Sequence, residues 1–256
     1  MRPRFGSVAL ILVFLASSLP ASAEVLQTQT TFNSNGKTIL VDQFAPSDSA
    51  RHPAVIFVHG SDGMRTTAWK YAWSREFATR GYVVLIPHYF ASLGEGGGAR
   101  PGGHQNFALY LATLGDTVDF AARQPGVDSA RLGLMGYSLG GYLSLALGAR
   151  DDRIKTVVEF FGGMPAFAAR SLHRMPPTLI LHGEADPVVP VARAYELENL
   201  FKANGVLYEI KIYPGQGHGF TGEADLDSRR RTMSFFDKYL PPGAAAYFTK
   251  QMKHFR

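Results

Sequence analysis

The feature that most constrains the fold is a series of short, mostly apolar runs that alternate with stretches of helical pattern. The apolar runs lie at 53–60, 82–87, 131–136, 154–161, 178–183 and 208–213. The helical stretches lie at 67–80, 107–123, 139–150, 190–204 and 224–240. A strand that is apolar throughout is buried on both faces, which is typical of a parallel sheet covered by helices. The sequence therefore predicts an α/β fold with a mostly parallel sheet and helices on both faces.

The chain before the first apolar run has a different hydrophobic pattern. Residues 25–32 and 37–44 alternate loosely between apolar and polar side chains on either side of Asn33-Ser34-Asn35-Gly36. The Asn-Gly pair favours positive φ angles, which a tight hairpin turn requires. We expect an antiparallel hairpin at the start of the domain.

The first 23 residues have the pattern of a secretory signal peptide. Arg2 and Arg4 precede an unbroken apolar run at 8–15, and Ala21-Ser22-Ala23 is a small-residue cleavage pattern. A membrane anchor is the alternative, but a spanning helix needs about 20 apolar residues. We expect a signal peptide over 1–23, a single domain over 24–256, a periplasmic or secreted location, and no stable membrane insertion after cleavage.

Composition excludes several classes of site and partner. The chain has no cysteine, which rules out disulfides, thiolate metal sites and a cysteine nucleophile. Its formal net charge is +5, and cleavage after Ala23 would remove two arginines and leave +3. Nucleic-acid binding calls for a concentrated basic stripe, so we expect no nucleic-acid partner. We also expect no metal and no cofactor, because no H-E-x-x-H set is present.

Two further segments stand outside the alternating pattern. Residues 94–103 are rich in glycine but lack the Gly-Lys-Ser/Thr of a phosphate-binding loop. They are interpreted as a mobile loop, with a lid over a ligand as the alternative. Residues 241–256 mix basic and aromatic side chains. They are interpreted as a solvated or packed extension, with contact to an anionic membrane surface as the alternative.

Ser138 occupies a position that has a chemical explanation. It lies in Gly136-Tyr137-Ser138-Leu139-Gly140, between a predicted buried strand and a predicted helix. This G-x-S-x-G pattern is typical of a sharp turn that strains the serine backbone and lifts its hydroxyl above the carboxyl end of a sheet. Glycines flank the serine because side chains there would collide with neighbouring backbone. Ser138 is therefore a candidate nucleophile.

A serine hydroxyl needs a base and an acid to act as a nucleophile, and both follow in the expected chain order. Asp186 follows the run at 178–183, and His218 follows the run at 208–213. Because the carboxyl ends of parallel strands meet at one edge of a sheet, we expect the three side chains to converge. His218 is the candidate base, and Asp186 is the candidate acid that orients it.

Other acids and histidines compete for these roles. Glu184 is close to Asp186 in sequence, and Glu159 lies inside the preceding strand-like run. Asp186 is favoured because it precedes a Pro-Val-Val-Pro turn and the next helix. His182 ends a predicted strand and is expected to be packed, while His88 and His104 could line the cleft.

Acyl transfer also requires donors for the oxyanion that develops on the carbonyl. The backbone N–H of Leu139, directly after the nucleophile, is the first candidate. The second is expected in the loop after the run at 53–60, from Ser61, with Asp62 next.

Four motifs give the chain a resemblance to the α/β-hydrolase superfamily and, within it, to the dienelactone hydrolase family. They run in family order over most of residues 36–240: His59-Gly60-Ser61, residues 136–141, residues 183–190 and Gly217-His218-Gly219-Phe220. The resemblance implies an α/β-hydrolase fold in a single domain, with Ser138, Asp186 and His218 as the triad. The enzymes that give the family its name use a cysteine nucleophile, whereas this chain has a serine.

The predicted function is that of an exported serine hydrolase acting on a small ester or lactone through an acyl-enzyme. Tyr89, Phe90 and Tyr137 flank strand ends and are the candidate walls of the substrate pocket. A small serine peptidase or amidase is the alternative, since the nucleophile motif does not separate the two bonds. A non-catalytic binding protein on the same fold is a further alternative, although such proteins typically lose a triad member.

Overall fold

The structure, a computed structural model, describes residues 24–94 and 105–243. The signal peptide predicted at 1–23, the glycine-rich segment beyond Gly94 and the tail beyond Gly243 lie outside the described residues. Among the helices that are described, none has the length and apolar character needed to cross a membrane.

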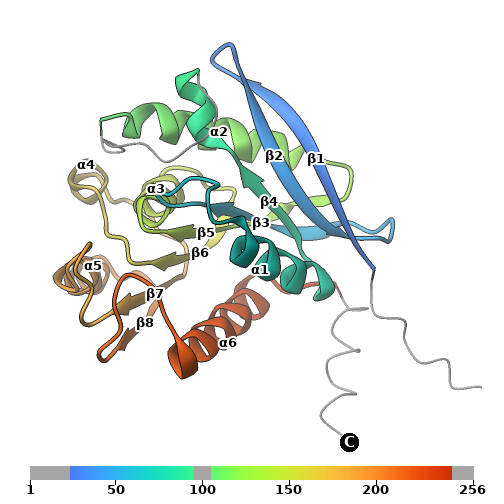
Figure 1. Cartoon of the computed structure of the whole chain (residues 1–256). Helices are drawn as coiled ribbons and strands as arrows, with labels where there is room; N and C mark the ends of the chain where they lie inside the picture. The colour runs from blue at the N-terminus through green and yellow to red at the C-terminus, as the bar shows by residue number, and fades with distance from the viewer. Residues whose placement is uncertain (1–23, 95–104, 244–256) are drawn as a thin grey trace, which may run out of the picture.

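Eight strands form one sheet, as Figure 1 shows. In chain order they are β1 (Val25–Ser34), β2 (Lys37–Pro46), β3 (His52–Val58), β4 (Val83–Pro87), β5 (Val127–Tyr137), β6 (Ile154–Phe160), β7 (Thr178–Gly183) and β8 (Tyr208–Tyr213). Their order across the sheet is β1-β2-β4-β3-β5-β6-β7-β8. β2 pairs antiparallel with both β1 and β4, and every other pair is parallel. The predicted α/β class with a mostly parallel sheet is confirmed.

Helices cover both faces of this sheet. The first face carries α1 (Thr67–Thr79) and α6 (Gly222–Tyr239). The opposite face carries α2 (Phe107–Ala122), α3 (Leu139–Gly148), α4 (Ala166–Arg170) and α5 (Ala192–Ala203). The short α4 and the 3₁₀ helix η1 (Tyr89–Leu93) were not predicted, because each is about one turn long and has no readable period.

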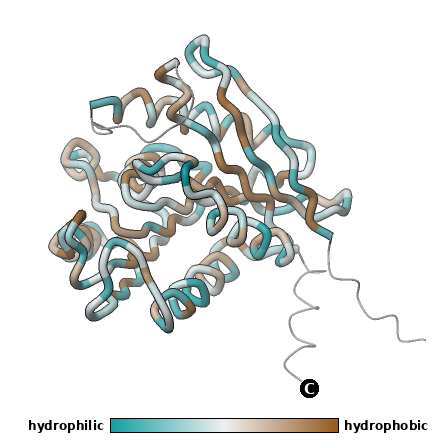
Figure 2. The backbone as a smooth tube through the Cα atoms, viewed as in Figure 1, coloured by the Kyte–Doolittle hydropathy of each residue, from teal (hydrophilic) through white to brown (hydrophobic). Residues whose placement is uncertain are grey.

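The central strands divide their side chains between two cores. In β3, Ile56 packs with the core under α2 and α3, whereas Val55 and Phe57 pack with the core under α1 and α6. Because successive side chains of a strand point to opposite faces, both sets must be apolar. Figure 2 shows the result as hydrophobic stretches that follow the strands through the middle of the molecule.

The predicted N-terminal hairpin is present as β1 and β2. Asn35 and Gly36 form its turn with φ angles of 50° and 74°, which is the left-handed geometry that an Asn-Gly pair favours. The Ser34 hydroxyl at the end of β1 donates a 2.6 Å hydrogen bond to the Asp116 carboxylate of α2. The hairpin is thereby fastened to the helix layer.

α6, the last described helix, packs beside α1, the first helix of the chain's described part. Phe236 packs edge-on against Phe77 of α1, with ring centroids 5.4 Å apart. The Tyr82 hydroxyl donates a 3.1 Å hydrogen bond to Asp237, 155 residues further along the chain. The core under α1 is therefore completed by the last helix.

The direction of winding places a crevice at the centre of the sheet. From β3 the chain moves to β4 on one side, and then crosses back to β5 on the other side of β3. In open α/β sheets, ligands bind at the carboxyl ends of the strands where the winding reverses in this way. The loops after β3 and β5, which carry Ser61 and Ser138, lie at this point.

Candidate active site

Ser138 lies on a strained turn between β5 and α3. Its φ and ψ angles are 56° and −119°, a conformation that costs a residue with a side chain about 1–3 kcal/mol. A side chain at Gly136 would collide with the Gly140 carbonyl, and one at Gly140 would collide with the Val58 carbonyl of β3. The turn therefore tolerates only glycine at these two positions, as the G-x-S-x-G pattern predicts.

The structure brings Ser138, His218 and Asp186 together in one chain of hydrogen bonds. The Nε2 atom of His218 lies 2.9 Å from the Ser138 hydroxyl, and its Nδ1 atom lies 2.7 Å from Oδ2 of Asp186. Because a carboxylate only accepts, Nδ1 carries the proton and Nε2 is left free to accept from the serine. This is the arrangement in which a histidine can take the proton of a serine hydroxyl.

The loop that carries Asp186 holds its side chain in place and keeps it charged. Oδ1 accepts hydrogen bonds from the backbone N–H groups of Val188 and Val189, at 2.8 and 2.9 Å. Burial opposes ionisation, but these hydrogen bonds and the one from His218 outweigh it, so the pKa of Asp186 is lowered. His182 is buried, as expected, and its Nε2 donates to the Val189 carbonyl at 2.8 Å, which fastens the same loop.

The competing residues have other surroundings. Glu184 is exposed and accepts a hydrogen bond from the Gly215 N–H at 3.3 Å. Glu159 is fully buried in β6, where burial raises its pKa to about 8. It accepts a hydrogen bond from the Gly162 N–H at 2.8 Å. His88 bonds to Asp42 at 2.9 Å, and His104 lies outside the described residues.

Two backbone N–H groups are the candidate oxyanion donors beside Ser138. Leu139 is the first residue of α3, so its N–H has no acceptor within the helix. The Ser61 N–H has no backbone acceptor among the residues that the structure describes. The loop that carries Ser61 is fixed by a neighbouring ion pair, in which the buried Lys70 donates to Asp62 at 2.7 Å. This ion pair lowers the pKa of Asp62 although burial opposes ionisation.

The predicted substrate contacts of Tyr89 and Phe90 need correction. Both side chains are fully buried, because η1 turns them inward after β4. Tyr89 stacks on His59 at 4.1 Å, its hydroxyl donates to the His59 carbonyl at 2.8 Å, and Phe90 packs edge-on against the same imidazole. Neither residue lines the two cavities at Ser138. Through their contacts with His59, both rings support the loop that carries Ser61. Burial lowers the pKa of His59 to about 3.

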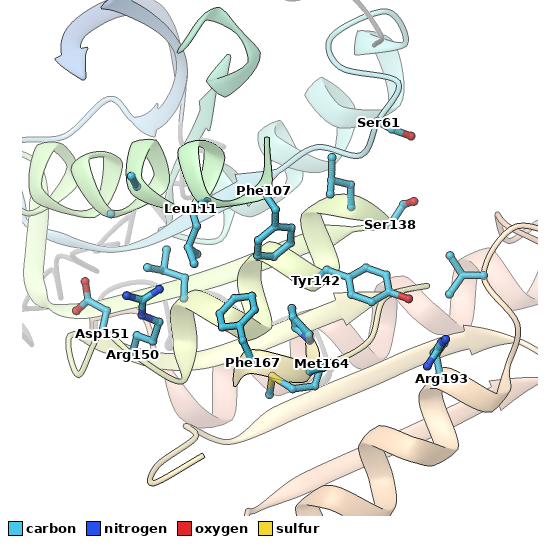
Figure 3. A pocket seen from close by; sticks show the side chains of 18 of the residues that line it. Ser61, Phe107, Leu111, Ser138, Tyr142, Arg150, Asp151, Met164, Phe167 and Arg193 are labelled. Carbon is cyan, nitrogen blue, oxygen red and sulfur yellow. The ribbon is translucent and has the colours of Figure 1, made fainter. Parts of the chain in front are cut away.

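Two cavities meet at Ser138. One has a volume of about 490 Å³ and lies on the α1 and α6 side; it is called the aromatic cavity here because it is lined by the rings of Phe57, Trp69, Trp73, Tyr137, Phe160 and Phe220. The other has a volume of about 1780 Å³ and runs along α3 between α2 and α4; it is called the α3 groove. Figure 3 shows Ser138 and Ser61 at one end of the α3 groove and Arg150 at the other.

Tyr137 lines the aromatic cavity, and its hydroxyl donates to the His218 carbonyl at 2.8 Å, so its place as a substrate contact stays a prediction. Trp69 and Trp73 were missed by sequence reasoning. They are the only two tryptophans of the chain and lie four residues apart in a helical stretch, so both face the same side of α1. That spacing was the available signal.

The described residues contain no group of three or more histidine, aspartate and glutamate side chains that could hold a metal ion. The site consists of a serine, an imidazole, a carboxylate and two backbone donors. These groups can support nucleophilic attack on a carbonyl and stabilise the resulting oxyanion.

Comparison with known proteins identifies relatives of the same fold. The chain is 25% identical over 190 residues to the "Putative carboxymethylenebutenolidase" of Methylorubrum extorquens, a match that covers 64% of this chain. The chain spans 65% of that relative's own length, which is less than two thirds.

Two solved structures have the same overall arrangement. A dienelactone hydrolase-like promiscuous phosphotriesterase from metagenomic libraries matches with a TM-score of 0.72 and 16% identity, over 86% of this chain and 99% of its own. The acylaminoacyl peptidase of Pyrococcus horikoshii matches with a TM-score of 0.71 and 17% identity, over 85% of this chain and 42% of its own. The dienelactone hydrolase family profile matches residues 42–240, which include every residue of the site. The chain belongs to the dienelactone hydrolase family of α/β hydrolases.

Proposed function

We propose that this protein is a serine hydrolase that cleaves a small ester or lactone through an acyl-enzyme. The observation that carries the proposal is the continuous hydrogen-bonded chain from the Ser138 hydroxyl through His218 to Asp186. Membership of a hydrolase family supports the same reaction class.

The geometry suggests a role for each group. Ser138 attacks the carbonyl carbon as Nε2 of His218 takes its proton, and Asp186 stabilises the imidazolium that forms. The oxyanion accepts hydrogen bonds from the N–H groups of Leu139 and Ser61. His218 then gives its proton to the departing alcohol oxygen, which leaves the acyl group on Ser138. The oxygen of a water molecule then bonds to the acyl carbon as His218 takes a proton from it. The bond from that carbon to Ser138 Oγ breaks as Oγ takes this proton from His218, and the acid is released.

The hydrolysis of p-nitrophenyl esters by residues 24–256 tests the proposal. Wild-type protein should release nitrophenol with a burst or steady turnover, and Ser138→Ala should lose at least about 10³-fold in kcat. Ser171→Ala removes an exposed hydroxyl outside both cavities and serves as the matched control. Equal activity in Ser138→Ala would overturn the assigned nucleophile.

The same protein can distinguish an esterase from an amidase. We expect faster turnover of a p-nitrophenyl ester than of the matching p-nitroanilide, because the alcohol is the better leaving group. Turnover of the anilide alone would reassign the chain as a peptidase or amidase.

We also propose that the protein acts outside the cytoplasm, because residues 1–23 have a charged, apolar and small-residue order typical of a signal peptide. N-terminal sequencing of protein expressed from the full chain should find Glu24 as the first residue. An intact Met1 on cell-associated protein would contradict export.

A further inference from the structure

The two cavities at Ser138 differ in how they relate to His218. His218 and Gly219 line the aromatic cavity, whereas the α3 groove is bounded on that side by residues 188–190. Ser138 and Ser61 line both cavities, so the reacting carbonyl sits where they meet. An ester whose carbonyl lies at this point can extend one half into each cavity.

The position of the His218 imidazole determines which half of the ester occupies which cavity. Nε2 of His218 is 2.9 Å from the Ser138 hydroxyl and must pass its proton to the oxygen of the departing alcohol. A proton donor must lie within hydrogen-bond reach of the atom that it protonates. The alcohol oxygen therefore leaves on the His218 side, which is the side of the aromatic cavity.

The chemistry of the aromatic cavity indicates what kind of alcohol it accepts. Its rings are arranged at steep angles, with Trp69 5.5 Å from Phe57 and Trp73 5.6 Å from Phe160 between centroids. Such walls leave ring faces and edges available to a further aromatic group. Because an apolar cavity of about 150 Å³ can hold benzene, a volume of about 490 Å³ is sufficient for a ring and a short linker.

The charged groups of the aromatic cavity are already paired with one another. Asp62 is bonded to Lys70 at 2.7 Å, and Arg229 donates to Asp225 at 3.0 Å while lying over the Trp73 ring. A charged alcohol would have to displace one of these pairs. The cavity is therefore suited to a neutral ligand.

The α3 groove has a different shape and lining. Ser138 and Arg150 are twelve residues apart, which corresponds to about 18 Å along a helix axis. Between these ends, the side chains of Phe107, Leu111 and Phe167 point into the groove (Figure 3). The groove also carries charged side chains, namely Arg150, Asp151, Asp152, Arg153 and Arg193. Arg153 is paired with Asp151 at 2.6 Å and Arg193 with Glu196 at 2.7 Å. The apolar wall formed by Phe107, Leu111 and Phe167 suits an extended acyl chain.

We propose that the aromatic cavity is the leaving-group subsite, which takes a neutral aryl or arylalkyl alcohol, and that the α3 groove takes the apolar acyl chain. The assignment rests on the proposed function, because it presupposes an acyl-enzyme on Ser138. It narrows the substrate class to esters of an aromatic alcohol with an aliphatic acid.

The acyl-enzyme gives a direct test, because an added alcohol can replace water in the second step. The alcohol oxygen bonds to the acyl carbon, its proton passes to His218, and the bond from that carbon to Ser138 Oγ breaks as Oγ takes the proton. The incoming alcohol must occupy the leaving-group subsite, since this step reverses the first. With p-nitrophenyl hexanoate as donor, wild-type protein should transfer hexanoyl to benzyl alcohol in preference to hexan-1-ol.

Substitutions in the two cavities should separate the subsites. Trp69→Ala should reduce the benzyl-to-hexyl product ratio roughly tenfold. Trp69→Phe keeps a ring and should retain most of the preference. Phe167→Ala should leave the product ratio unchanged and lower the kcat/KM for dodecanoyl relative to acetyl esters. Leu207→Ala, an exposed residue that lines neither cavity, is the control.

The outcomes distinguish this assignment from the proposed function. An unchanged product ratio in Trp69→Ala, or a ratio that falls in Phe167→Ala instead, would overturn the subsite assignment alone. Absence of a hexanoyl adduct on Ser138 by intact-protein mass spectrometry, with no nitrophenol released, would overturn both.

Discussion

The ammonium group of Lys70 lies 2.7 Å from Oδ2 of Asp62, and the lysine side chain is fully buried. Lys70 belongs to α1, whereas Asp62 follows Ser61 in the loop after β3. The lysine also donates to the Thr66 carbonyl at 3.0 Å and to the Thr66 hydroxyl at 3.1 Å. One buried cation thus ties the loop that carries Ser61, the proposed oxyanion donor, to the helix that lines the aromatic cavity.

Removing this cation should disturb catalysis through the position of Ser61. Lys70→Met leaves Asp62 without its ionic partner, and we expect kcat for a p-nitrophenyl ester to fall about 10- to 100-fold with a smaller change in KM. Lys211→Met removes a partly buried lysine of the edge strand β8 that lines neither cavity and is the control. A change confined to KM would show that the ion pair affects binding and leaves the oxyanion donor in place.

The strained backbone of Ser138 predicts an order of stability for two inactive variants. Alanine keeps the cost of the positive φ angle, whereas glycine adopts it freely. Ser138→Gly should therefore be more stable than Ser138→Ala by about 1 kcal/mol in urea unfolding, although both lack the proposed nucleophile. The reverse order would indicate that the turn is relaxed in solution.

The buried carboxyl of Glu159 predicts a specific pH dependence of stability. Burial raises its folded pKa from 4.5 to about 8, so it stays protonated in the folded protein while the unfolded chain ionises. The stability that the protonated Glu159 carboxyl adds to the folded state is fully present below about pH 4.5. It is lost as the pH rises through about 8.

Glu159→Gln removes this titration and keeps an oxygen for the Gly162 N–H. The stability of the variant relative to wild type should therefore increase between pH 5 and pH 8, on the order of 1.4 kcal/mol per pH unit at the steepest. Urea unfolding at both pH values measures the difference. A constant difference across this range would mean that Glu159 is ionised at pH 5 already.

The hydrogen bond between Asp186 and His218 predicts that replacing the carboxylate of Asp186 with an amide lowers kcat strongly. Asp186→Asn can still accept from the N–H groups of Val188 and Val189, but its amide no longer holds the proton on Nδ1. We expect kcat to fall roughly 10⁴-fold with little loss of stability. Glu184→Gln, a nearby exposed acid, should keep full activity. A comparable loss in Glu184→Gln would transfer the role of the orienting acid to that residue.

The architecture and the position of Ser138 could be predicted because the signal for each lies in a short segment of the sequence. A strand that is apolar on both faces and a glycine-flanked serine each leave a pattern within a dozen residues, and β5 and α3 lie close to their expected bounds. Convergence of Ser138, Asp186 and His218 followed from the rule that parallel strands end at one edge.

The walls of the pocket could not be predicted in the same way. Tyr89 and Phe90 follow a strand end, as the pocket prediction required, but one turn of 3₁₀ helix rotates both rings into the core. The aromatic cavity depends on how α1 and α6 pack beside each other on one face of the sheet, and the two helices are more than 140 residues apart in the chain. Hydrophobic periodicity carries no information about such a contact.

The return of α6 to the side of α1 also has a consequence for biosynthesis. Tyr82, Phe77 and the strands beneath them are made early, but their cover arrives only when Phe236 and Asp237 have been translated. Until then the nascent chain exposes the part of this apolar face that α6 covers, and exposed apolar surface of this kind promotes aggregation. A chain that ends at Thr221, before α6, should therefore accumulate in inclusion bodies, whereas residues 24–256 should be recovered from the soluble fraction.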